Sequence, residues 1–238
     1  PVLSVGRRDE LLESWDMNVF ELGVGEQVAL VEGMYSGLGL MEPFQVPPKT
    51  LARFVSSVSR RYKNNPFHCL AHAVSVAHAT YMIVKTTRAA VHLRPLDKLA
   101  LLTASYCHDI DHPGNTNAFE VNSMSPLAMR HGDDAVLERH HTFVAFQVLL
   151  GEGGANNIFG GLTSDQFREA RKLMLESILA TDMSRHMVHC RKLSQLAHAV
   201  KGRHHRHMQH VGAPRWNRDS FLDEQCRLEE SGDEGGGG

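Results

Sequence analysis

Apolar residues recur every three or four positions along much of the chain. Four such stripes are Leu11, Leu12 and Trp15; Val28, Val31, Tyr35 and Leu38; Leu51, Phe54, Val55 and Val58; and Val74, Ala77, Tyr81 and Val84. This spacing places apolar side chains on one face of a helix. No segment alternates apolar and polar residues with turn signals at hairpin spacing. The pattern therefore predicts an all-α domain.

A further apolar run, residues 96–107, carries Leu99, Leu102 and Tyr106 at helical spacing and leads into His108-Asp109-Ile110-Asp111-His112-Pro113-Gly114. We expect a buried helix that delivers His108 and Asp109 to the interior. An unpaired carboxylate and imidazole would be unfavourable there, and a divalent cation satisfies both. Proline disfavours α geometry at the residue before it, so we expect the helix to stop soon after the pair. Asp111 and His112 should then lie on a loop.

Length and composition define the kind of protein. The chain has 238 residues, 42% of them hydrophobic, which suits one large core. A net charge of −2 gives no attraction to nucleic acid or an anionic membrane. The four cysteines are scattered, which argues against a zinc ribbon or a disulfide framework. Because the sequence shows neither a membrane-spanning apolar run nor a signal peptide, we expect a cytoplasmic protein.

The composition changes near residue 199. Residues 1–199 carry the helical patterns, whereas residues 200–238 are rich in histidine and arginine, then acidic, and end in four glycines. Such a polar, biased segment cannot bury a core, so we predict a disordered tail. Histidines 204, 205, 207 and 210 in this segment are interpreted as part of a solvated basic tail.

Histidine alone is weak evidence for a site, because the chain has 16 of them. His68 and His72 stand four residues apart, which predicts that they project from one helical face toward His108 and Asp109. The isolated His78 and His92 are interpreted as structural or surface residues.

Four motifs together resemble the class I 3′,5′-cyclic nucleotide phosphodiesterases of the HD superfamily. In chain order they are Tyr62-Lys63-Asn64-Asn65-Pro66-Phe67-His68-x3-His72; His108-Asp109-x-Asp111-His112-Pro113-Gly114; Leu137-Glu138-x-His140-His141; and Leu179-Ala180-Thr181-Asp182-Met183-Ser184. The similarity spans residues 11–186. It implies a multi-helical catalytic bundle that hydrolyses cAMP or cGMP to the 5′-nucleoside monophosphate in signal transduction.

The resemblance also implies two divalent metals, zinc and either magnesium or manganese. His72, His108 and Asp109 would hold the first metal, and the second oxygen of Asp109 would bridge to the other. His68 would protonate the departing 3′ oxygen as general acid. No choice between cAMP and cGMP follows.

Other residues match polar positions of the family. The resemblance places His112, Glu138 and Asp182 near the waters of the second metal and Met183 in the pocket wall. His140 and His141 are interpreted as structural hydrogen-bonding residues.

The chain also departs from the family. Cys69 stands where the family has asparagine, and residues 115–117 and 131–133 are altered. After about His186 the motifs stop, and we find no counterpart of a second aspartate on the first metal, a purine-reading glutamine or a stacking aromatic. Asp219, Asp223, Gln195 and Gln209 lack a supporting apolar frame. We therefore expect a truncated catalytic region whose exposed apolar faces favour aggregation or a homodimer.

The sequence leaves three functions to be tested. The first is the cyclic nucleotide phosphodiesterase. The second is another HD-domain phosphohydrolase that acts on linear nucleotides, although the His-Pro-Gly and Asn-Pro-Phe-His motifs argue against it. The third is a catalytically impaired product that binds metal or partners without turnover.

Overall fold

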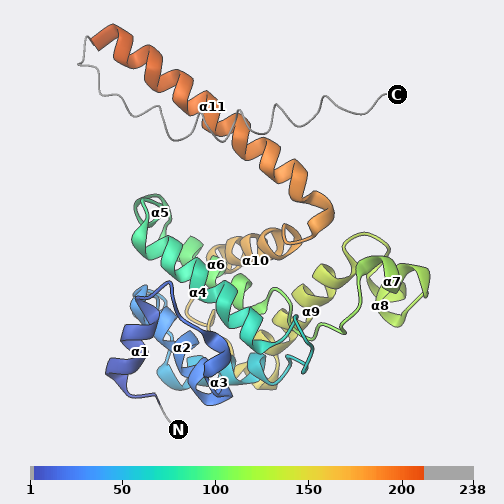
Figure 1. Ribbon diagram of the computed structural model, residues 1–238. Coiled ribbons are helices and arrows are strands. Elements are labelled where there is room, and N and C mark those ends of the chain that lie inside the picture. The colour runs from blue at the N-terminus through green and yellow to red at the C-terminus, as the bar shows by residue number, and fades with distance from the viewer. Residues whose placement is uncertain (1–2, 212–238) are drawn as a thin grey trace. The chain divides into compact units, whose positions relative to one another are not determined.

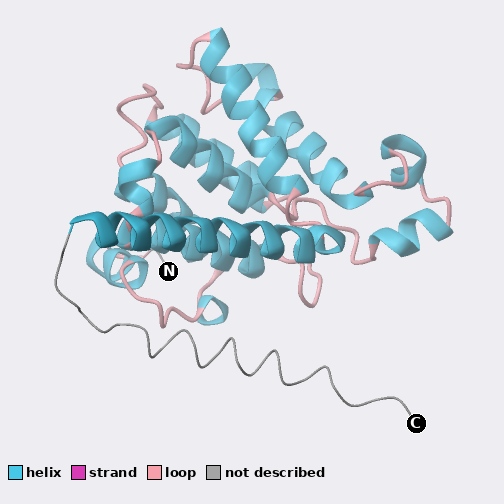
Figure 2. Ribbon diagram, turned by 90° about the horizontal axis from the view of Figure 1, so that it is seen from above, coloured by secondary structure: helices cyan, strands magenta, loops and turns pink. Residues whose placement is uncertain are grey.

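The computed structural model describes residues 3–211, and this part of the chain consists of helices and loops without a strand (Figure 2). The predicted all-α class is confirmed. Contacts divide the chain into two units, residues 1–186 and residues 187–238.

The first unit contains ten α-helices and three short 3₁₀ helices among its described residues (Figure 1). In chain order they are α1 Val5–Leu12, η1 Val19–Glu21, α2 Val24–Gly37, α3 Pro48–Ser59, α4 Leu70–Thr86, α5 Ala89–His92, α6 Pro95–Cys107, α7 Asn117–Asn122, α8 Pro126–His131, α9 Val136–Leu150, η2 Glu152–Gly154, α10 Ser164–Leu179 and η3 Met183–Arg185. The apolar stripes fall on these helices except for Leu38, which is the C-cap that follows α2, and Trp15. Because α1 ends at Leu12, Trp15 lies beyond it and is 58% exposed.

Helix α6 is central to the first unit, because it packs against α4, α10, α2 and α9. Buried side chains cover more than half of its circumference: Leu96, Leu99, Ala100, Leu102, Thr103, Ala104, Tyr106 and Cys107. The carboxylate of Asp97 accepts the Arg94 N–H at 2.9 Å and so caps the start of the helix. The helix ends at Cys107, with His108 as its C-cap. The buried helix predicted for residues 96–107 is therefore confirmed.

Buried tyrosines join α6 to its neighbours. Tyr35 of α2 shares a hydrogen bond with Thr103 at 2.9 Å, and the Tyr106 hydroxyl donates to the carbonyl of Val55 in α3 at 3.1 Å. Each bond satisfies a polar group that burial would otherwise leave without a partner. The end of α6 is consequently held from two sides.

The turn after α6 has an unusual backbone. Asp111 has a φ of 60°, in the left-handed region that a non-glycine residue adopts only when other contacts hold it. Those contacts are with Lys63, at 3.0 Å from one carboxylate oxygen, and with His140 of α9, at 2.9 Å from the other. Asp111 and His112 lie on a loop, as predicted.

The second unit begins within α11, His186–Val211. The helix continues through residues 200–211, where the sequence predicts a disordered tail, while residues 212–238 lie outside the described residues. None of the helices described is both long and apolar enough to cross a membrane.

Candidate functional site

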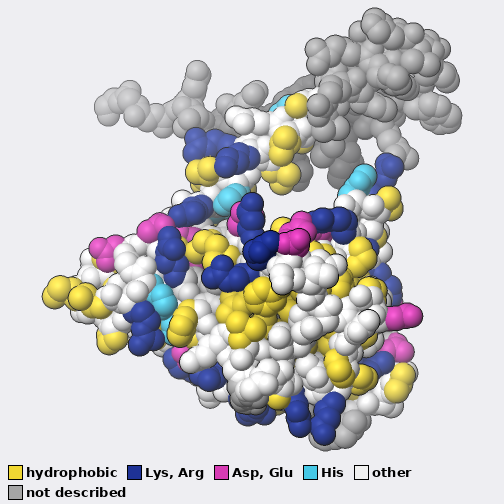
Figure 3. Space-filling view, turned by 180° about the vertical axis from the view of Figure 1, so that it is seen from behind, with side chains coloured by type: hydrophobic (Ala, Val, Ile, Leu, Met, Phe, Trp, Pro, Cys, Tyr) yellow, Lys and Arg dark blue, Asp and Glu magenta, His cyan; other side chains and the backbone are white. Residues whose placement is uncertain are grey.

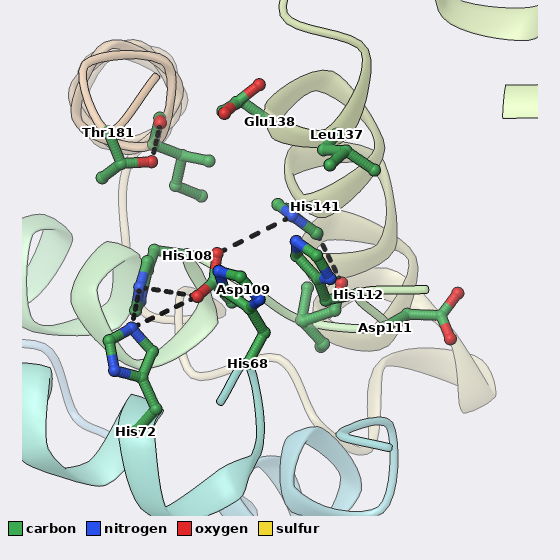
Figure 4. A network of polar contacts seen from close by, with 12 residues as sticks. His68, His72, His108, Asp109, Asp111, His112, Leu137, Glu138, His141 and Thr181 are labelled. Atoms are coloured by element: carbon green, nitrogen blue, oxygen red, sulfur yellow. Dashed lines mark hydrogen bonds and ion pairs between the residues drawn. The ribbon is translucent and has the colours of Figure 1, made fainter. Parts of the chain in front are cut away.

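Three side chains from two helix ends converge at the centre of the site (Figure 4). His72 lies in the first turn of α4, and His108 and Asp109 follow the last residue of α6. The Nε2 atoms of the two histidines are 3.2 Å apart. Oδ2 of Asp109 lies 3.3 Å from Nε2 of His72 and 3.1 Å from Nε2 of His108. The three atoms form a nearly equilateral triangle.

This triangle fits one face of a metal coordination sphere. A tetrahedral ion with bonds of about 2.0–2.1 Å places neighbouring ligand atoms about 3.3–3.4 Å apart. The measured separations of 3.1–3.3 Å are close to that value. Two imidazoles and one carboxylate are ligands suited to a divalent ion. The predicted set of His72, His108 and Asp109 is therefore brought together in a geometry that can hold a metal.

The protonation of the site also suits a cation. Nδ1 of His108 donates to the carbonyl of Ser105 at 2.8 Å, which orients the ring so that Nε2 faces the cluster. Burial works against the charge of Asp109, but hydrogen bonds from His108 and His72 lower the pKa of its carboxyl far below the ordinary value. Burial also disfavours the charged form of His108. The interactions with Asp109 and the carbonyl of Ser105 together outweigh burial, so the pKa of this imidazole is raised overall. The aspartate is thus an ionised ligand at neutral pH.

A second group shares Asp109 with His112 and His141, and its ligand atoms lie within 4.8 Å of one another. Burial lowers the pKa of His112 to about 4 and that of His141 to about 3, so both rings are neutral at pH 7. Nδ1 of His141 donates to the carbonyl of Ile110 at 2.7 Å, and its Nε2 therefore presents a lone pair 3.8 Å from Oδ1 of Asp109. This 3.8 Å spacing is wider than the spacings within the triangle.

His112 differs from His141 in its tautomer. Nδ1 of His112 accepts the N–H of Gly114 at 2.9 Å, so the proton of the neutral ring is on Nε2. A protonated nitrogen cannot bind a metal, but it can donate to a water or a phosphate oxygen. The hydrogen bonds therefore leave a lone pair on Nε2 of His141, which can act as a ligand, and make Nε2 of His112 a hydrogen-bond donor.

The position of His68 corrects one prediction. It does not share a helical face with His72, because α4 begins at Leu70 and His68 belongs to the loop before it. Pro66 disfavours helix immediately upstream, and Cys69 is extended, with φ −121° and ψ 179°. The ring of His68 nevertheless reaches the site, where it stacks on His112 at 3.9 Å and 9°.

Two further carboxylates flank the site on the side of α9 and α10. Glu138 is half-buried and accepts from Asn117 at 2.9 Å. Burial, with smaller contributions from Asp182 and Asp109, raises the pKa of Glu138. Asp182 is buried and caps η3 by accepting the N–H of Ser184 at 2.9 Å. Met183, predicted in the pocket wall, is 73% exposed.

The remaining histidines divide by their contacts. His140 and His141 make the expected hydrogen bonds, to Asp111 and to the carbonyl of Ile110. The sequence analysis did not predict that His141 also faces Asp109. The sequence signal available for this contact was the position of His141 directly after His140 in the same motif. His78 is buried against the carbonyl of Leu12 at 3.1 Å, and His92 is exposed, so both predictions are confirmed.

A cavity of about 700 Å³ lies elsewhere, among α8, α9 and α10. Its lining includes Phe143, Phe146 and Arg171 and contains none of the metal-cluster residues. The cluster around Asp109 is therefore separate from this cavity. On the face of the molecule opposite to Figure 1, lysine and arginine side chains lie beside hydrophobic ones (Figure 3).

Comparisons with known proteins agree with this geometry. A family model described as 3′5′-cyclic nucleotide phosphodiesterase matches residues 67–224, a range that extends beyond the last of the four motifs. The human high affinity cGMP-specific 3′,5′-cyclic phosphodiesterase 9A is 41% identical over 161 residues, covering 68% of this chain and 27% of that protein. The 3′,5′-cyclic-nucleotide phosphodiesterase regA of Dictyostelium discoideum is 36% identical over 184 residues, covering 77% and 23%.

A solved structure shows the same fold. The phosphodiesterase domain of the RhoPDE fusion protein from the choanoflagellate Salpingoeca rosetta matches with a TM-score of 0.74 and 34% identity. The match covers 79% of this chain and 60% of that domain. The chain spans about a quarter of the length of the curated relatives cited above. Motifs, cluster geometry and family match together show that the chain belongs to the 3′5′-cyclic nucleotide phosphodiesterase family.

Proposed function

We propose that this chain hydrolyses 3′,5′-cyclic nucleotides, cAMP or cGMP, to 5′-nucleoside monophosphates. One observation carries the proposal: the triangle of His72, His108 and Asp109 lies beside the ring of His68. In the reaction a water oxygen adds to phosphorus and the bond from phosphorus to the 3′ oxygen breaks. A proton must therefore reach the 3′ oxygen, and an imidazole at the edge of a metal cluster is suited to deliver it.

The proposed cofactors are zinc at the triangle and magnesium or manganese at the second position. Mixed imidazole and carboxylate ligation suits zinc, whereas a site with fewer protein ligands and more water suits magnesium. Bound divalent ions supply Lewis-acid activation of water and of the phosphate. Asp109 is the bridging ligand in this proposal, because its two oxygens face different histidines, Oδ2 toward His72 and His108 and Oδ1 toward His141.

The other residues have proposed roles that follow from their contacts. His68 is the general acid, and His112 donates its Nε2 proton toward the phosphate or a water. Glu138 and Asp182 accept hydrogen bonds from waters on the open side of the cluster. Met183 contributes an apolar surface for the base, which its 73% exposure leaves available.

Hydrolysis assays with the purified chain test this proposal. The chain is loaded with zinc and either magnesium or manganese, and its turnover of cAMP, cGMP and linear nucleotides is compared. We expect turnover of a cyclic nucleotide, and His68→Ala should lower kcat at least about 100-fold, the scale of general acid catalysis. His92→Ala, at an exposed position outside the site, is the matched control.

Each alternative has a distinct outcome. Equal activity in the His68→Ala variant and the parent would refute the assigned acid. Turnover of linear nucleotides alone would identify another HD-domain phosphohydrolase. A folded, metal-loaded chain without turnover would support the non-enzymatic function.

The proposed self-association is tested separately. Met187, Leu193 and Leu196 of α11 are 64%, 70% and 63% exposed, and apolar groups of this size on one helix favour contact with another chain. Sedimentation velocity should show a dimer that weakens when Leu193 and Leu196 are both replaced by glutamate. A monomer at all concentrations would exclude the homodimer.

A further inference from the structure

The segment between α3 and α4 bonds to the main chain at three points, one in the last turn of α6 and two in the loop that follows it. The Tyr62 hydroxyl donates to the carbonyl of Tyr106 at 2.7 Å, and Lys63 donates to the carbonyl of Asp111 at 3.2 Å. Nδ2 of Asn65 donates to the carbonyl of His112 at 2.9 Å. The last carbonyls of a helix lack partners within the helix, so side-chain donors from elsewhere can hold them. This segment therefore fixes the path of the chain from the end of α6 through His112.

Asn65 makes a second hydrogen bond that the other two residues do not make. The same Nδ2 donates to the carbonyl of His68 at 3.1 Å. An amide nitrogen carries two hydrogens, and here each one has a carbonyl. The opposite orientation would place the amide oxygen against two carbonyl oxygens, so the hydrogen bonds fix which way the amide points. Asn65 thus ties His68 and His112 to a single planar group.

This tie matters because His68 lies outside α4 and the helical hydrogen bonds do not hold it. Its ring stacks on that of His112 at 3.9 Å and 9°, an arrangement that requires the two backbones to keep a fixed separation. The amide also lies beside Gly114, where an added Cβ would come within ordinary van der Waals contact of Oδ1 of Asn65, at 3.4 Å. A shift of Asn65 would therefore change the place of the His68 ring relative to the cluster.

We propose that Asn65 is a positioning residue that holds His68 at the distance and angle needed for proton delivery to the 3′ oxygen. The inference rests on the proposed function, because it assigns Asn65 an effect on catalysis through His68. In the reaction His68 gives its proton to the 3′ oxygen as that oxygen leaves phosphorus, and the ring regains a proton from the attacking water through solvent. Asn65 touches neither the substrate nor a metal ligand side chain.

The experiment replaces Asn65 with leucine, which has a similar shape and removes both hydrogen bonds. Asn64→Leu is the matched control, because the adjacent Asn64 is exposed and makes no side-chain hydrogen bond within the described residues. A misplaced catalytic group of this kind costs up to about 100-fold. We therefore expect Asn65→Leu to lower kcat about 10- to 100-fold with KM within about twofold and bound metal unchanged. Asn64→Leu should match the parent.

Two comparisons distinguish a positioning role of Asn65 from a general disruption of the site. In a His68→Ala background, Asn65→Leu should lower kcat much less than it does in the parent, since the acid is gone and only the hydrogen bond to the His112 carbonyl remains to act. A 4-nitrophenyl phosphodiester, whose leaving group departs without protonation, should lose much less rate in Asn65→Leu than a cyclic nucleotide does. Independent, additive effects of the two substitutions would overturn the proposal. Equal losses on both substrates would overturn it as well.

A structural measurement keeps the inference testable if the chain has no activity. The ring protons of His68 should show an upfield NMR shift from the stacked ring of His112, which Asn65→Leu removes and Asn64→Leu retains. An unchanged shift in Asn65→Leu would refute the positioning role whatever the activity. Absence of turnover in the parent protein, with the shift changing as expected, would instead refute the proposed function alone.

Discussion

Acid should destabilise the metal-free protein through His141, and the size of the effect follows from its burial. The ring is 1% exposed, and burial lowers its pKa from 6.5 in the unfolded chain to about 3 in the folded one. Because the fold favours the neutral form, stability is complete above pH 6.5. It is lost as the pH falls below 6.5, and the loss continues until the pH reaches about 3. At pH 5.0 the unfolded histidine has bound its proton and the folded one has not.

The magnitude follows from the pKa difference. One pKa unit is worth about 1.36 kcal/mol, and pH 5.0 lies 1.5 units below the unfolded pKa of 6.5, so His141 costs about 2 kcal/mol at that pH. His112, with a folded pKa of about 4, adds a similar amount. His108, with a raised pKa, acts in the opposite direction and grows more stabilising as the pH falls. A comparison of the parent with His141→Gln reports the contribution of His141 together with its interactions with Asp109 and His112.

Urea unfolding at pH 7.5 and pH 5.0, both with EDTA, measures this effect. The parent should lose about 2 kcal/mol more than His141→Gln does between the two pH values, whatever stability the variant has at pH 7.5. His92→Gln, at an exposed position, should follow the parent. If the parent and His141→Gln lose the same free energy, the reasoning from burial is wrong.

Four further substitutions have definite expected results. Asp109→Asn should weaken the binding of zinc more than about 100-fold in a chelator competition, because even outer partners of metal ligands are worth 10- to 100-fold. Gly161→Ala should lower the free energy of unfolding by more than about 2 kcal/mol, since its Cβ would lie 2.1 Å from the carbonyl oxygen of Phe44. Gly25→Ala, with open space around the Cβ, should raise that free energy by up to about 1 kcal/mol. Leu99→Ala should cost about 2–5 kcal/mol, because Leu99 is fully buried in the central helix.

Each of these expectations has an outcome that would contradict it. Zinc affinity retained in Asp109→Asn would remove the aspartate from the ligand set. A Gly161→Ala variant as stable as Gly25→Ala would mean that the loop at residue 161 moves to accommodate the added Cβ without a loss in the free energy of unfolding. A loss of less than about 1 kcal/mol for Leu99→Ala would show that α6 does not organise the core.

Helix α6 shows what local pattern can predict. Apolar residues at Leu99, Leu102 and Tyr106 identify a helix from their spacing alone, and the Pro113-Gly114 pair marks the turn after it. The same spacing rule failed for His68 and His72. Four residues separate them, but Pro66 and the extended Cys69 delay the start of α4 to Leu70. Spacing predicts a shared face only where the helix has already begun.

The histidines of α9 show where sequence reasoning could not reach. His140 and His141 are adjacent in the motif, yet one bonds Asp111 and the other faces Asp109. Neighbouring residues on a helix point about 100° apart, and which of them meets the metal loop depends on how α9 lies against α6. That orientation follows from packing among distant segments and leaves no mark in the local pattern.

The sequence by itself determined the helical class, the central buried helix and the family resemblance, and that resemblance implied His72, His108 and Asp109 as metal ligands. The helices follow from local periodicity, whereas the implied ligand set follows from motifs that lie far apart in the chain. Only the tertiary structure decided that Asn65 joins His68 to His112, that His112 keeps its proton on Nε2, and that His141 presents a lone pair to Asp109. Each of these depends on a hydrogen bond to a main-chain carbonyl or N–H, and every residue type carries those groups alike. Residue identity therefore does not encode such bonds, and the packing of helices and loops selects them.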